Sequence, residues 1–382
     1  MKKCKIISKV VVFILLFVII YGKVSSVLSI GNNFTATIGS YRSFFAEPNN
    51  SIQIVTLGNS RMYSSWNSLE LWKKSGVTSY CLSTGLQPAV MVQYLMEEVR
   101  KTQENPLFII DINCFRKDQI YAMNDINIRR VIDCIPMSSN KIDMIEATLK
   151  LYPQAMDYQI EKVNEAIEKA ELMPDKIEYE DKLKSLLEER DNVSKLRYYW
   201  TFPQYHSRWS KLKKSDFTGE GTPYKSVYYD KRMFQTKPIN GPTLTTQSDI
   251  LDVNQKSILE DLFSYIEKNR LNVLFVSLPA SLRTDYAKDL NGVKDFIANK
   301  GETCIDFNTN DMYENLSIDF SKDFYDIDHM NIKGSMKLMN YMTSYITDHY
   351  SMENQRGVEG SESWDEELQD YLKYLEKMQE EE

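Results

Sequence analysis

The feature that most constrains this chain is an uninterrupted apolar run close to its amino terminus. Residues 10–21 read Val-Val-Val-Phe-Ile-Leu-Leu-Phe-Val-Ile-Ile-Tyr. The run is preceded by Lys2, Lys3, Lys5 and Lys9. These twelve residues rise about 18 Å as a helix, which is short of the roughly 30 Å hydrocarbon core of a bilayer. A basic flank before a short apolar run is typical of a cleaved signal peptide, which is one interpretation of this segment.

A longer span is available when the flanking residues are counted. Lys9 and Lys23 can extend their ammonium groups to the headgroups, so residues 6–28 suffice to cross a bilayer. No Ala-x-Ala cleavage pattern follows. The sequence therefore predicts an uncleaved signal anchor over residues 1–30, with a cleaved signal peptide and a buried core helix as alternatives. The positive-inside rule places residues 31–382 on the extracytoplasmic side of the cell membrane, in a single-pass protein.

Composition and charge exclude several classes of function. Apolar residues make up 42% of the 382 positions, which is ample for a folded core. The basic residues form no long stripe, so we expect no nucleic-acid partner. The three histidines show no HxxxH or HExxH spacing, and the five cysteines no CxxC pair. We therefore expect no metal centre, no bound cofactor and, outside the cytoplasm, no ATP-dependent reaction; whether the external cysteines are paired stays open.

The net charge of −8 belongs to the carboxyl-terminal tail. Residues 353–382 hold eleven Asp/Glu and three Lys/Arg, which accounts for all of it. Such a run is usually a solvated surface. However, apolar residues recur at helical spacing, and Ser363 with Glu366 resembles a capping box. The alternative for the tail, residues 351–382, is thus a short amphipathic helix whose apolar face is formed by Trp364, Leu368, Tyr371, Leu372, Leu375 and Met378.

In the rest of the chain, predicted strands alternate with predicted helices, as in a parallel α/β domain. Buried strands are predicted over residues 51–58, 106–112, 272–279 and 303–307. Helices are predicted over residues 68–74, 89–102, 253–270, 286–300 and 331–348. Residues 31–135 and 243–350 are therefore predicted to form one sheet domain. Residues 136–242, with helices expected at 141–151 and 160–196, are predicted to be an insertion.

Ser60 is the first candidate for chemistry. It follows Gly58 and Asn59 at the end of a predicted strand, so its hydroxyl should project from the carboxyl edge of the sheet, where open α/β folds bind ligands. A serine there can be a nucleophile, or it can simply be the N-cap of the next helix. The GxSxG elbow of the α/β-hydrolases is absent.

The second candidate is a pair near the carboxyl terminus, Asp326 and His329. An aspartate three residues before a histidine can orient the imidazole ring and stabilise it once it accepts a proton, as in half of a hydrolase triad. Asp328 is a weaker candidate for the carboxylate because its position points it away from the ring. The alternative is an Asp-rich loop that caps the final helix through Asp328 or Asn331.

The two candidates together resemble the SGNH/GDSL hydrolase superfamily. The blocks that carry the resemblance are Gly58-Asn59-Ser60-Arg61 and Asp326-Ile327-Asp328-His329, in the superfamily's order along the chain. The resemblance implies a three-layer, flavodoxin-like parallel sheet flanked by helices, with Ser60, Asp326 and His329 as the catalytic residues. It also implies that Ser60 N–H, Gly85 N–H and the Asn113 amide stabilise an oxyanion. Asn59 replaces the usual aspartate, and Asn113 lacks the usual Gly-x-Asn-Asp context.

An SGNH-like domain on a single membrane helix is similar to the D-alanine transfer proteins of teichoic acid synthesis and to alginate O-acetylation proteins. The likeness implies transfer of an acetyl or D-alanyl group to a cell-envelope glycan or polymer, beside a multi-span membrane-bound O-acyltransferase. A simple carbohydrate esterase or deacetylase is the alternative enzyme. A non-catalytic envelope assembly protein that retains the fold is the alternative outside catalysis.

The insertion carries a cluster of aromatic and basic residues over positions 197–209. It includes Trp200, Tyr205 and Trp209. Such a cluster can be a stacking platform for a sugar acceptor, or it can pack the insertion onto the main domain.

Overall fold

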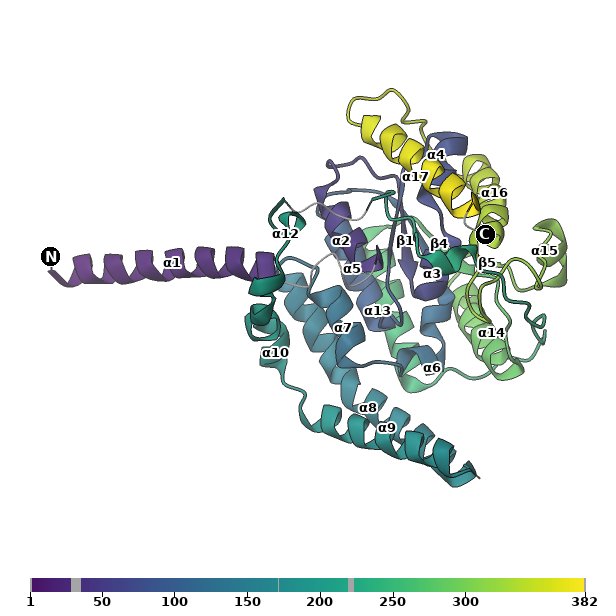
Figure 1. The fold of residues 1–382 in the computed structure, drawn as a ribbon, viewed down its shortest axis with the longest axis horizontal. Helices are drawn as coiled ribbons and strands as arrows, with labels where there is room; N and C mark the ends of the chain where they lie inside the picture. The colour runs from purple at the N-terminus through teal and green to yellow at the C-terminus, as the bar shows by residue number, and fades with distance from the viewer. Residues whose placement is uncertain (1, 29–35, 171, 219–222, 381–382) are drawn as a thin grey trace.

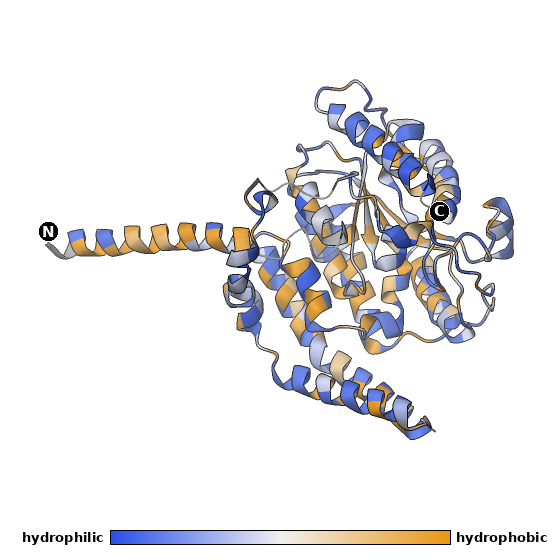
Figure 2. Cartoon of the chain, in the orientation of Figure 1, coloured by the Kyte–Doolittle hydropathy of each residue, from blue (hydrophilic) through white to orange (hydrophobic). Residues whose placement is uncertain are grey.

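The amino-terminal segment is a long exposed helix in a computed structural model that describes residues 2–28, 36–170, 172–218 and 223–380. Helix α1 (Lys2–Leu28) extends away from the body of the molecule, and Figure 2 shows its middle as almost wholly apolar. The stretch Lys5–Ser25 has a mean hydropathy of 2.3 and none of it is buried. One helix is therefore long and apolar enough to span a membrane, and the buried-helix alternative is wrong.

A five-stranded parallel sheet forms the centre of the domain. Its strands are β1 (Ile54–Gly58), β2 (Ser79–Ser83), β3 (Leu107–Asp111), β4 (Val273–Ser277) and β5 (Cys304–Asp306). They lie in the order β2-β1-β3-β4-β5, all parallel. The four predicted strands thus join one sheet across the insertion, which confirms the α/β prediction. Strand β2 was not predicted, because Ser-Tyr-Cys-Leu-Ser lacks the β-branched residues that mark strands.

Helices cover both faces of this sheet (Figure 1). One apolar core joins the sheet to α2 (Ala36–Ala46), α5 (Val92–Arg100), α13 (Val253–Asn269) and α14 (Thr284–Asn299). The other joins the opposite face to α3 (Ser60–Ser65), α4 (Ser68–Ser75) and α16 (Ile332–His349). Shorter elements connect these, namely η1 (Ala89–Met91), η2 (Ile112–Phe115), α6 (Lys117–Ile120), α7 (Asp125–Ile132), η4 (Lys231–Phe234) and α15 (Asn310–Asn315). Cys81, Cys114 and Cys304 are free thiols.

The insertion is built on a helical hairpin. Its arms are α8 (Ser139–Lys169) and α9 (Met173–Asp191), which pack against each other and project from the body (Figure 1). The predicted break at residues 152–159 is wrong, because α8 continues through Pro153. Four short elements follow, α10 (Lys195–Tyr199), α11 (Phe202–Tyr205), η3 (His206–Lys211) and α12 (Lys214–Thr218). Of these, α11, η3 and α12 lie beside the carboxyl-terminal end of α1, whereas α10 packs on α8.

The acidic tail ends in a docked helix, α17 (Glu362–Glu380). Its buried face holds Trp364, Leu368, Tyr371, Leu375 and Met378, which excludes a wholly solvated tail. Trp364 packs on Trp72 of α4 with ring centroids 5.5 Å apart, and Asn67 Nδ2 donates a hydrogen bond to Tyr371 Oη at 2.8 Å.

 The capping box predicted at Ser363 is wrong, because the helix begins before it, at Glu362, and the Ser363 hydroxyl instead accepts from Lys225 Nζ at 3.0 Å.

Candidate active site

The site lies where the strand order reverses. From β1 the chain runs outward to β2 and then returns to β3 on the other side of β1. In open parallel sheets this reversal leaves a crevice at the carboxyl ends of the two central strands, which is where ligands bind. Ser60 follows β1, Gly85 follows β2 and Asn113 follows β3. The topology therefore brings these three predicted residues to one edge of the sheet.

Gly58 allows β1 and β3 to approach closely at this edge. A Cβ at position 58 would lie 3.0 Å from the Asp111 Cβ and 3.1 Å from the Met62 Cβ. Any larger residue would push the start of α3 away from β3. The glycine thus fixes the position of the helix that carries Ser60.

Asn59, and not Ser60, is the N-cap of α3. Its side-chain oxygen accepts a hydrogen bond from Arg61 N at 3.2 Å. The alternative that Ser60 caps the helix is therefore wrong. As the first helical residue, Ser60 keeps its hydroxyl for another partner, and its backbone N–H belongs to the first turn, whose amides have no acceptor within the helix.

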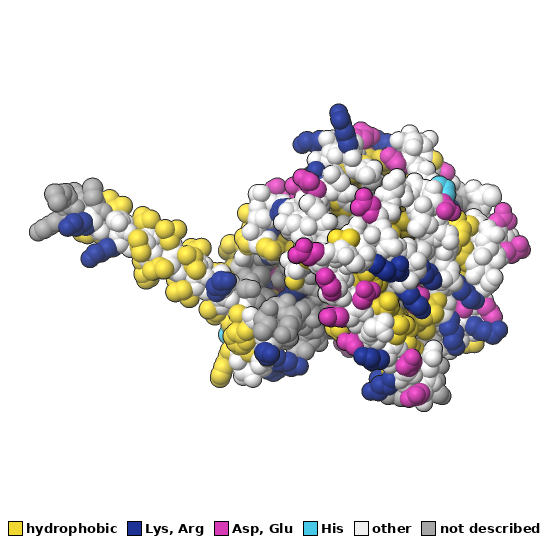
Figure 3. Space-filling view, turned by 90° about the horizontal axis from the view of Figure 1, so that it is seen from above, with side chains coloured by type: hydrophobic (Ala, Val, Ile, Leu, Met, Phe, Trp, Pro, Cys, Tyr) yellow, Lys and Arg dark blue, Asp and Glu magenta, His cyan; other side chains and the backbone are white. Residues whose placement is uncertain are grey.

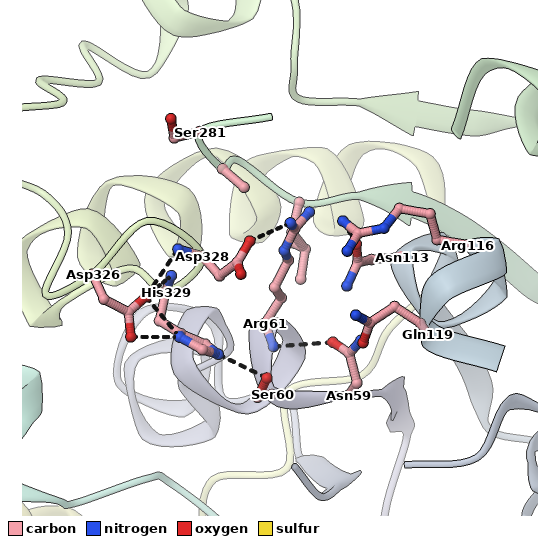
Figure 4. A network of polar contacts seen from close by, with 12 residues as sticks. Asn59, Ser60, Arg61, Asn113, Arg116, Gln119, Ser281, Asp326, Asp328 and His329 are labelled. Carbon is pink, nitrogen blue, oxygen red and sulfur yellow. Dashed lines mark hydrogen bonds and ion pairs between the residues drawn. The ribbon is translucent and has the colours of Figure 1, made fainter. Parts of the chain in front are cut away.

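That partner is His329. Ser60 Oγ lies 2.7 Å from His329 Nε2 (Figure 4). On the other side of the ring, His329 Nδ1 lies 2.8 and 2.9 Å from the two carboxylate oxygens of Asp326. A carboxylate only accepts, so Nδ1 carries the proton and Nε2 is left as the acceptor that faces the serine hydroxyl. The three predicted catalytic residues form one hydrogen-bonded chain.

The local backbone holds Asp326 in this position. Asp326 Oδ1 also accepts from Asp328 N at 2.8 Å and from His329 N at 2.9 Å. Burial raises the pKa of Asp326, but the hydrogen bond and charge of His329 and the two backbone amides outweigh it, so the net pKa lies below its ordinary value. The Tyr325 ring stacks on His329 with an interplanar angle of 6°. The imidazole is thus fixed on one face and at Nδ1.

Asp328 has a different role from Asp326. Its carboxylate lies 2.5 Å from Arg61 Nη2 and points away from the imidazole ring (Figure 4). The Arg61 side chain is 3% exposed. The ion pair therefore ties the loop that carries His329 to the helix that carries Ser60. The final helix, α16, is capped by Asn331, whose side chain accepts from Lys333 N and Gly334 N.

The side-chain oxygen of Asn113 already accepts a hydrogen bond. Arg116 Nη1 donates to Asn113 Oδ1 at 3.0 Å, and Asp111 Oδ1 accepts from Asn113 N at 3.2 Å. Among the described residues, Asn113 Nδ2 has no hydrogen-bond partner, so its two N–H groups are available to a ligand. Asp111 is fully buried, and burial raises its pKa to about 6 although the charge of Arg61 opposes the shift.

The polar groups enclose a cavity of about 250 Å³. It is lined by Asn59, Ser60, Arg61, Tyr63, Gly85, Leu86, Asn113, Arg116, Gln119, Arg130, Asp328 and His329. Ser60, Gly85, Asn113 and His329 therefore share one cavity, as the sequence predicts. The Gly85 carbonyl accepts from Arg130 Nη1 at 3.2 Å.

Sequence reasoning missed the arginines of this cavity. Arg61 was visible only as the residue after the serine, and its partner Asp328 lies 267 positions away. Arg116 pairs with Asp118 through two bonds of 2.5 and 2.7 Å. Their signal in the sequence is their position in the segments that follow β1 and β3, at the ligand-binding edge. None of Trp200, Tyr205 and Trp209 lines the cavity, so the insertion's aromatic cluster is not a platform at this site.

The chain matches no protein-family model and no curated protein. Fold and geometry thus define the class: an α/β protein with a Ser–His–Asp hydrogen-bonded chain at the carboxyl edge of a parallel sheet.

Proposed function

We propose that the protein is an SGNH-type serine O-acyltransferase or ester hydrolase that acts outside the cytoplasm on O-acyl groups of a cell-envelope glycan or polymer. The observation that carries this proposal is the 2.7 Å hydrogen bond between Ser60 Oγ and His329 Nε2, with Asp326 on Nδ1. A serine within hydrogen-bond reach of a base that a third group orients is the arrangement of an activated nucleophile. The supporting sequence feature is the order of the two blocks that carry the resemblance.

In the first half-reaction, the Ser60 oxygen attacks the carbonyl carbon of the donor ester. The Ser60 proton moves to His329 Nε2, and the imidazolium is stabilised by Asp326. The tetrahedral intermediate places a negative charge on the former carbonyl oxygen, which the Ser60 N–H, Gly85 N–H and Asn113 amide are proposed to bind. The intermediate then collapses: the alcohol leaves with the proton from His329, and the acyl group stays on Ser60.

In the second half-reaction, an acceptor hydroxyl attacks the acyl-serine. His329 takes the acceptor's proton and returns it to Ser60 Oγ as the ester to Ser60 breaks. If the acceptor is water the reaction is ester hydrolysis, and if it is a sugar or polyol hydroxyl the reaction is acyl transfer. The same residues catalyse both reactions, so the acceptor determines whether the enzyme is an ester hydrolase or an acyltransferase.

The proposed location rests on α1. A helix of this length and hydropathy would anchor the domain, and four lysines at its amino end favour a cytoplasmic amino terminus. An acyl group would then reach Ser60 on the far side of the membrane, for which a multi-span membrane-bound O-acyltransferase is the proposed partner.

The test is an ester assay with the full chain in detergent. We expect the wild type to release acetate from an acetyl ester, and Ser60→Ala to lose at least about 1,000-fold in rate. Ser281→Ala is the matched control, because Ser281 is a half-buried serine near the site whose hydroxyl donates to Asn240 O instead of to a histidine. Adding a glycan acceptor should raise acetyl-glycan formation at the expense of free acetate if the enzyme is a transferase. Equal rates for wild type and Ser60→Ala would contradict the proposal.

A further inference from the structure

A segment of the insertion packs against the carboxyl-terminal end of α1. We call residues 195–217, which span α10, α11, η3 and most of α12, the collar. Within it α11, η3 and α12 contact α1, while α10 packs on α8 (Figure 1). The Tyr21 and Phe202 rings lie 6.2 Å apart, and Leu28 packs with Tyr205 in a small separate core. The collar therefore packs at the carboxyl-terminal end of the apolar helix rather than against the sheet.

These contacts fix the depth of the collar relative to a bilayer. The apolar span of α1 ends at Ser25. Tyr21 lies one helical turn before that end, or about 6 Å along the axis at 1.5 Å per residue. The Tyr21–Phe202 contact thus places Phe202 at the boundary between hydrocarbon and headgroups when α1 spans a membrane. The other collar elements that contact α1, η3 and α12, therefore lie near the same boundary.

The collar exposes large apolar side chains at this level. The exposed fractions are 56% for Trp200, 72% for Trp209 and 66% for Phe217. The three remaining tryptophans, Trp66, Trp72 and Trp364, are buried in the domain. Tryptophan favours the membrane interface because its ring is apolar and its N–H remains close to water. Both exposed tryptophans of the described chain therefore lie where a bilayer surface would cover them.

The charge of the collar complements an anionic lipid surface. It contains Lys195, Arg197, Arg208, Lys211, Lys213 and Lys214 against the single acidic residue Asp216. Asp216 is buried and pairs with Arg208 at 2.7 Å. Lys211, Lys213 and Lys214 are exposed. Figure 3 shows apolar and basic side chains together at the root of α1. Basic residues beside a membrane helix attract anionic headgroups.

We propose that the collar is a membrane-interface surface, which inserts Trp200 and Trp209 among the headgroups of an anionic leaflet on the side of the domain. The proposal rests on the membrane insertion of α1 proposed above and is independent of the acyl chemistry. The domain would then contact the bilayer at two places, the helix and the collar, and this restricts its rotation about the end of α1.

Tryptophan quenching in vesicles tests the collar. The full chain is reconstituted into phosphatidylcholine vesicles containing phosphatidylglycerol, with or without lipids brominated near the headgroup end of the acyl chain. We expect brominated lipid to remove roughly two-fifths of the tryptophan emission, the share of two exposed tryptophans among five. The double variant Trp200→Phe/Trp209→Phe should lose nearly all of this quenching. The control Trp364→Phe should keep it, because Trp364 is buried against α4.

A charge variant and a flotation measurement separate membrane contact by the collar from membrane insertion of α1. Lys211→Gln/Lys213→Gln/Lys214→Gln should reduce the quenching at least twofold in anionic vesicles and leave it unchanged in pure phosphatidylcholine. A chain that floats with the vesicles but shows equal emission with and without bromine would overturn the collar and leave the anchor standing. A chain that does not float would overturn both, while covalent labelling of Ser60 would still report on the acyl chemistry separately.

Discussion

Arg61 and Asp328 form an ion pair of 2.5 Å between residues 267 positions apart, and it joins the two halves of the candidate site. Each residue is adjacent in sequence to a member of the hydrogen-bonded chain, Arg61 to Ser60 and Asp328 to His329. The pair therefore fixes the distance between the serine hydroxyl and the imidazole without contacting either reacting atom. Arg61 and Asp328 are positioning residues in this account.

Asp328→Asn should loosen this connection. Arg61 would stay buried without a carboxylate, which we expect to lower the free energy of unfolding by about 2 kcal/mol; this is less than for a fully buried pair because Asp328 is 39% exposed. The ester hydrolysis rate should fall with it. The control is Asp285→Asn, whose partner Arg283 is also 2.5 Å away but 65% exposed, and which should change stability by less than about 0.5 kcal/mol. Urea unfolding of the full chain in detergent measures the free energy of unfolding of both variants. Equal effects of the two variants would argue against a positioning role for the Arg61–Asp328 pair.

Asn113→Ala should act on the rate rather than on binding. The amide N–H groups are proposed to bind an oxyanion that exists only in the transition state, so kcat should fall by about 100- to 1,000-fold with little change in KM. Gln119→Ala is the matched variant, because Gln119 lines the same cavity but its amide donates to Asp118. It should change kcat by less than about tenfold. Steady-state kinetics with an acetyl ester measure kcat and KM for both variants. An increase in KM at constant kcat for Asn113→Ala would assign Asn113 to substrate binding instead.

Asp111 should make stability depend on pH. Its pKa in the folded protein is about 6, above the ordinary value of 3.8, because the carboxyl group is buried. The folded state therefore binds this proton more tightly than the unfolded state, and the stability present in acid is lost as the pH rises from about 4 to above 6. A difference of about two pKa units corresponds to about 3 kcal/mol.

Asp111→Asn removes this titration and keeps an oxygen that can accept from Asn113 N. The free energy of unfolding of the variant, relative to wild type, should therefore rise by about 3 kcal/mol between pH 4 and pH 7. Urea titrations at a series of pH values measure the difference. A difference that does not change with pH would show that Asp111 keeps its ordinary pKa.

Trp364→Ala should release the carboxyl-terminal helix. Trp364 is 1% exposed and packs on Trp72, so the cavity left behind should cost about 3–5 kcal/mol. Lys373→Ala on the same helix, whose side chain is 73% exposed, should cost less than about 0.5 kcal/mol. Limited proteolysis of the tail and urea unfolding report on both variants. Equal protease resistance in wild type and Trp364→Ala would contradict the docking of α17.

Sequence patterns predicted the parts of the fold that depend on local character. The strands 106–112 and 272–279 are apolar along their length because both faces of a parallel sheet are covered, and this leaves a clear signal. Strand β2 has serine at both ends and was missed, although all of its residues are buried. The tail helix was visible in its apolar spacing, whereas its first residue was not.

The candidate site likewise contains residues with a local sequence signal and residues without one. Ser60, Asp326 and His329 could be chosen because two short blocks stand at the expected places in the chain. The Arg61–Asp328 pair could not, since no periodicity relates residues so far apart. The contact of Phe202 with Tyr21 is equally invisible in the sequence, because it depends on how a long insertion returns to the amino-terminal helix.

The most direct test of the central claim is covalent labelling with a serine-directed fluorophosphonate, followed by mapping of the modified peptide. If Ser60 is a nucleophile activated by His329, the full chain should take up about one label per molecule on Ser60, and His329→Ala should label at least about 100-fold more slowly. Failure of the correctly folded wild type to react, or labelling at a serine other than Ser60, would contradict the account.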